Sequence, residues 1–98
     1  MIVRRPVLPD LYVDGDRCAA FAADQVVVLS EFATSILLGI PEGGDTTVAD
    51  ITARVLEEFG PPEPPLDPAT VVTAQVVALS EHGILALDAA EGGEGQPA

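Results

Sequence analysis

Short apolar runs alternate with turn-forming residues in the first third of the chain, which is the pattern of antiparallel strands. Residues 11–13 lead into Asp14-Gly15, a dipeptide that favours tight hairpins, and residues 17–21 form a second extended run. Residues 23–25 indicate another reversal before the β-branched run at residues 26–29. We therefore expect a three-stranded antiparallel meander.

Two segments that follow show apolar residues at helical spacing. Ser30 is placed to cap a helix over residues 31–38. Thr47, followed by Asp50 at the third helical position, approximates a capping box and opens a helix over residues 48–59. The meander is thus expected to lead directly into a pair of helices.

The last third of the chain begins with a proline-rich stretch, residues 60–65. Its four prolines exclude a helix or a central strand, and we interpret it as a stiff surface connector rather than a polyproline ligand. Asp67 then caps a third helix over residues 68–82, with proline at its first position. Residues 84–87 close the fold as a short extended piece.

The length and composition indicate one domain. A chain of 98 residues with 48% hydrophobic residues can bury one core and no more. We assign this domain to residues 1–87. Residues 88–98 are rich in Gly, Ala and Glu without an apolar run, so we expect a disordered acidic tail there.

The net charge of −12, from sixteen acidic residues against four arginines, restricts the partners. Such a field repels phosphate backbones and anionic lipid headgroups, so we expect neither nucleic acid nor membrane binding. No window reaches the roughly 18 to 20 apolar residues of a membrane span. The first residues lack the apolar run of a signal peptide and Cys18 is the only cysteine, so the expected compartment is the cytoplasm.

Little in the sequence suggests catalysis. His82, the only histidine, is expected to cap a helix, and Cys18 is expected to act as a small apolar residue. One Cys and one His make no zinc site, and the acidic pairs at 14–16 and 57–58 are interpreted as solvated surface. We therefore expect a non-catalytic binding domain without a cofactor.

Three short motifs follow one another at a recognisable spacing. They are Leu29-Ser30 between strand and helix, Thr-Val-Ala-Asp-Ile at 47–51, and Leu-Ser-Glu-His-Gly-Ile at 79–84. Over residues 11–87 the chain resembles the PqqD-like family, in which a hairpin, a strand-Leu-Ser/Asn-helix junction, a Thr-Val-x-Glu-Ile helix start and a Leu-x-x-x-Gly-Leu/Ile ending occur in this order. Asp50 in place of the commoner Glu and the longer connector depart from that pattern.

The resemblance implies an α+β, winged-helix-like domain: a three-stranded antiparallel meander, three helices and a short C-terminal strand. It also implies a RiPP recognition element, which binds the leader of a ribosomally made precursor peptide and presents it to a modifying enzyme such as a radical SAM enzyme, a cyclase or a protease. The leader would add as a further strand to the third strand of the meander. The strand that would receive it comprises Gln25, Val26, Val27, Val28 and Leu29.

The third helix carries more apolar surface than one core contact needs. At about 100° per residue, Val72, Val76 and Leu79 form one stripe facing the core. The flank beside it places Val71 and Ala78 together with Gln75 and His82. We expect Val71, Gln75 and Ala78 to line a groove with the third strand; packing against the sheet or against a dimer partner is the alternative.

Two other functions remain open at this level. A winged-helix transcription regulator has the same order of elements, but the segment from Asp67 to His82 contains no Arg or Lys for DNA. A structural dimerisation domain is the other alternative. If the leader hypothesis holds, the acidic domain predicts Lys or Arg beside the apolar anchors of the leader.

Overall fold

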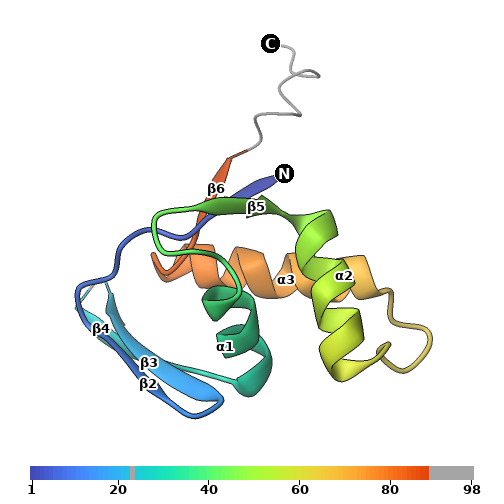
Figure 1. Ribbon diagram of the computed structural model, residues 1–98, viewed down its shortest axis with the longest axis horizontal. Coiled ribbons are helices and arrows are strands. Elements are labelled where there is room, and N and C mark those ends of the chain that lie inside the picture. Colours follow the sequence, from blue (N-terminus) through green and yellow to red (C-terminus); the bar gives the residue numbers. More distant parts are fainter. Residues whose placement is uncertain (23, 89–98) are drawn as a thin grey trace.

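The computed structural model describes residues 1–22 and 24–88, which form a small α+β domain of two antiparallel three-stranded sheets and three helices. Figure 1 shows α1 in the middle of the domain, with the β2–β3–β4 sheet on one side of it and α2 on the other. The elements are β1 (Ile2–Arg4), β2 (Leu11–Asp14), β3 (Arg17–Ala22), β4 (Gln25–Leu29), α1 (Glu31–Leu38), β5 (Asp45–Thr47), α2 (Val48–Phe59), α3 (Pro68–Glu81) and β6 (Ala86–Asp88).

The segments expected to form a meander do so as β2, β3 and β4, which pair in that order. Gly15 has a φ of +64° at the first reversal and Asp24 has the same φ at the second, so a glycine and an aspartate supply the left-handed backbone of the two turns. In the pairing, Cys18 lies opposite Leu29 and Phe21 lies opposite Val26. Ala23 lies outside the described residues.

A second sheet, of order β5-β1-β6, was not expected. Its strands are three residues long, too short for an alternating pattern to identify them. The C-terminal strand also begins two residues later than predicted, and Asp88 belongs to it rather than to a tail. Asp88 pairs with Ile2, and its carboxylate accepts a hydrogen bond from Arg4 at 2.9 Å. Residues 89–98 lie outside the described residues.

The three helix starts are confirmed by their capping contacts. The side chains of Ser30, Thr47 and Asp67 each accept a hydrogen bond from the backbone N–H three residues further on, at 3.1 Å in all three cases. The third helix ends at Glu81, with His82 as its C-cap. Each cap pairs one of the N–H groups that the first helical turn leaves without an intrahelical partner.

The core lies where the inner face of the meander, the three helices and the second sheet meet. Burial of each large aliphatic side chain contributes about 1.5–3 kcal/mol. The least exposed large side chains are Val3, Leu29, Ile36, Leu37, Ile40, Ile51, Val72, Val76 and Ile84. No helix in the described ranges combines the length and apolarity needed to cross a membrane.

Candidate functional site

The edge of β4 is the first feature that can bind another molecule. Among the described residues, β3 is the one strand paired with β4, so the second side of β4 has no strand beside it. Phe21 donates its N–H to the carbonyl of Asp10 at 3.0 Å, on the side away from β4. Because hydrogen bonding alternates along an antiparallel ladder, Val26, which pairs with Phe21, directs its N–H and C=O to the open side, and so does Val28.

Alternation also separates the β4 side chains between two faces. Val26 and Val28 are 68% and 69% exposed and share the outer face of the sheet with Phe21 and Tyr12. Val27 is partly buried and Leu29 is fully buried on the inner face, toward the helices. Val26 and Val28 therefore offer their backbone groups at the open edge while their side chains lie on the outer face of the sheet.

A groove runs beside the inner face of β4, with a volume of about 280 Å³. Strand β4, the start of α1 and the second half of α3 form its walls. Gln75 and His82 supply polar side chains, while Ala33 and Ala78 leave room because their side chains are short. The lining residues are Val27, Val28, Leu29, Ser30, Ala33, Gln75, Ala78, Leu79 and His82.

The structure brings most of the predicted site residues together. Val27, Val28, Leu29, Gln75 and Ala78 all line the groove. Gln25 and Val26 lie on the same strand, at its exposed first half. The expected residues of β4 and those of α3 thus meet at one place.

Val71 does not line the groove but lines a different pocket. Val71 lies one helical turn before Gln75. At Gln75 this flank of α3 lies beside the groove next to β4, whereas at Val71 it lies beside the other pocket. Four groove residues were not among the predicted site residues. His82 was placed on the flank of Gln75 and Ala78 but given only a capping role, and Leu79 was assigned to the core stripe. Ser30 and Ala33 follow β4 in the chain, and their proximity to α3 depends on tertiary packing.

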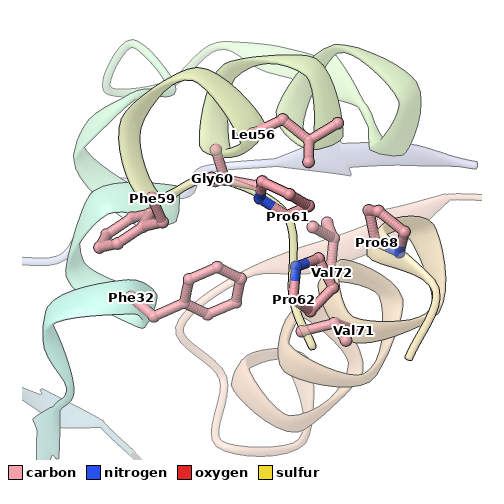
Figure 2. A pocket seen from close by; sticks show the side chains of 10 residues that line it. Phe32, Leu56, Phe59, Gly60, Pro61, Pro62, Pro68, Val71 and Val72 are labelled. Atoms are coloured by element: carbon pink, nitrogen blue, oxygen red, sulfur yellow. The ribbon is translucent and has the colours of Figure 1, made fainter. Parts of the chain in front are cut away.

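The second hollow is an apolar pocket between the three helices and the connector (Figure 2). It measures about 200 Å³. Phe32 and Phe59 form one wall, in an edge-to-face contact with ring centroids 5.4 Å apart. We call it the proline-walled pocket; it is lined by Phe32, Val55, Leu56, Phe59, Gly60, Pro61, Pro62, Pro68, Val71 and Val72.

The reactive side chains are not gathered at either hollow. Cys18 is 3% exposed, and its Sγ accepts a hydrogen bond from the Thr34 hydroxyl at 3.5 Å. His82 is accompanied by no Cys, Asp or Glu among the residues that line the groove. In residues 1–22 and 24–88, no three or more His, Cys, Asp or Glu side chains are grouped so that they could hold a metal ion.

An open strand edge beside a groove suits the binding of an extended chain. Backbone groups at Val26 and Val28 offer hydrogen bonds, and the groove offers space for side chains. Comparison with models of protein families, with curated proteins and with solved structures found no match.

Proposed function

We propose that this domain binds an extended peptide by strand addition to β4 and acts as a RiPP recognition element of the PqqD-like kind. It holds the leader of a precursor peptide in the cytoplasm and presents the precursor to a modifying enzyme. A winged-helix-like arrangement of the meander and the helices belongs to this proposal. The observation that carries it is the open edge of β4 lying directly beside the groove.

The alternation along β4 defines how the peptide lies. Peptide residues opposite Val26 and Val28 form the backbone hydrogen bonds, and their side chains join the exposed outer face. The residue opposite Val27 directs its side chain inward, to the groove beside Gln75 and Ala78. Hydrogen bonds therefore supply affinity that is independent of sequence, and the inward position supplies specificity.

Size and charge are consistent with a short peptide segment. The five residues of β4 span roughly 17 Å, which matches one strand of a leader. Acidic residues lie at both ends of the binding region, with Asp24 before β4 and Glu31 after it. Lys or Arg beside the apolar anchors of the leader would be attracted there, so we expect association to be faster at low salt.

A DNA-binding role is not supported by the charges on α3. Helix α3, which occupies the position of a recognition helix in the proposed arrangement, contains no Arg or Lys between Pro68 and Glu81. A helix that reads DNA needs cationic side chains against the phosphates. The peptide hypothesis is favoured because it needs no positive charge.

The experiment is a titration of the ¹⁵N-labelled domain with the leader of a precursor encoded beside its gene. We expect saturable chemical-shift changes at Val26 and Val28, and slower amide exchange at these two residues because their N–H groups become hydrogen-bonded. A scrambled leader of the same composition is the control. Failure of the leader to bind at high micromolar concentration would exclude the function.

A further inference from the structure

The proline-walled pocket is held open by a stiff boundary. Gly60 ends α2 with a φ of +79°, a conformation that directs the chain into Pro61 and Pro62. Figure 2 shows these two prolines between the aromatic pair and the valines of α3. Because proline has a fixed φ, this wall cannot readily collapse into the space beside Phe59.

The lining determines what the pocket can bind. Every lining side chain is apolar, so a bound group gains by burying hydrocarbon and finds no side-chain hydrogen bond. A volume of about 200 Å³ suits one aromatic ring or branched aliphatic group, since a cavity of about 150 Å³ accommodates benzene. The pocket is therefore the size of a single anchoring side chain.

The surroundings of the pocket are acidic. Glu31 precedes Phe32, Glu58 precedes Phe59 and Glu63 follows Pro62 in the chain, and Glu31 and Glu58 line a separate hollow with Asp16. Between residues 31 and 81 the one Arg or Lys is Arg54, whose guanidinium donates to carbonyls of α1. A positively charged group on a partner is thus attracted by the net negative charge of the segments that form the pocket.

We propose that the proline-walled pocket is a second binding site, which takes an aromatic or branched aliphatic side chain of a partner protein flanked by Lys or Arg. A second copy of this chain is disfavoured as the occupant because both copies carry the net charge of −12. The site lies against the first half of α3, at Val71 and Val72, whereas the groove lies against Gln75 to His82. Both sites can therefore be filled at once, whatever occupies β4.

Two small molecules with the same ring and opposite charge test the chemistry of the pocket. Phenethylamine carries an ammonium and phenylacetate a carboxylate, and each is titrated into the ¹⁵N-labelled full chain. We expect phenethylamine to bind with a millimolar Kd and to shift Phe59, Val71 and Val72 but not Val26. Phenylacetate should bind about 2- to 5-fold more weakly at low salt, with the difference shrinking as salt is added.

Two variants of α3 locate the binding. Val71→Thr keeps the shape of a partly buried lining residue but adds a hydroxyl, and should raise the Kd of phenethylamine by about 3-fold. Val77→Thr makes the same change at a partly buried position outside the pocket and should leave the Kd unchanged. Equal weakening by both variants would contradict the assignment.

Three further results would overturn the proposal. The first is no saturable shift at the pocket residues with the wild-type chain. The second is equal affinity for the two molecules at low salt. The third is a change of the Val71 and Phe59 signals on dilution without any probe, which would identify a second copy as the occupant. None of these results depends on whether a leader binds at β4, so the two proposals fail independently.

Discussion

The guanidinium of Arg54 on α2 lies directly against Gly39, in the space where a Cβ would project. From there it donates to the carbonyl of Ser35 at 3.2 Å and to that of Ile36 at 3.5 Å. These carbonyls belong to the last turns of α1, the end of a helix that carries partial negative charge. The missing side chain of Gly39 therefore allows Arg54 to join α1 to α2.

Gly39→Ala should be destabilising only while Arg54 is present. An alanine would displace the guanidinium and lose about 1–2 kcal/mol of charge-assisted hydrogen bonding and helix-end interaction. With Arg54→Ala already in place, the same change should be neutral or stabilise by up to about 1 kcal/mol, because the backbone of Gly39 is right-handed helical. Urea unfolding of the wild type and the three variants measures this coupling, and additive effects would contradict the contact.

Val28→Pro should weaken leader binding without unfolding the domain. The N–H of Val28 is directed to the open side of β4, so a proline there removes a donor for the peptide but not one for β3. Losing one hydrogen bond of about 1 kcal/mol net predicts an affinity loss of roughly 5-fold. Val27→Pro, one residue away, removes a donor of the β3–β4 ladder and should lower the melting temperature. If Val28→Pro lowered the melting temperature more than Val27→Pro, the inferred directions of the two N–H groups would be wrong.

Ala78→Leu should block the groove while the fold remains intact. The larger side chain extends into the hollow that the inward-facing peptide residue requires, and we expect an affinity loss of about 10-fold or more. Ala74→Leu is the matched control, because it makes the same change on an exposed face of the same helix. Calorimetric titration with the leader compares the two, and equal losses would show that the groove plays no specific part.

Val3→Ala should be much more destabilising than any change to the ion pair beside it. Val3 is fully buried in the central strand of the second sheet, so losing two methyl groups should cost about 2–3 kcal/mol. Arg4 and Asp88 are about half exposed, and Arg4→Gln should cost less than about 1 kcal/mol. Denaturant unfolding gives both values. Similar costs would mean that β1 is not part of the cooperative core.

Helix caps and turns could be predicted from the sequence because neighbouring residues alone determine them. Ser30, Thr47 and Asp67 each place a side-chain oxygen within reach of the N–H three residues on, and this geometry needs no tertiary context. The two turns of the meander were readable for the same reason. A left-handed backbone is easiest for Gly and is tolerated by Asp, as Gly15 and Asp24 show.

Features that join distant segments were not predictable in the same way. The pairing of β1 with β5 and β6 joins residues more than 40 positions apart through strands of three residues, which leave no periodic signal. Val71 shares a helix flank with Gln75, yet it lines a pocket with the connector. The first half of α3 lies beside the connector, and the second half lies beside β4. The proline-walled pocket requires four separate segments, so no local pattern could reveal it.

Ile2 and Asp88 are cross-strand partners, so the first and last strands of the described chain bring its two ends together at the same end of the second sheet. Figure 1 shows this sheet away from β2, β3 and β4. A leader or an enzyme joined to the domain through Ile2 or through Asp88 therefore starts from nearly the same point relative to β4, with residues 89–98 counted as part of the second linker. Its effective concentration at the binding edge is set by the length of the linker and depends little on which end carries it.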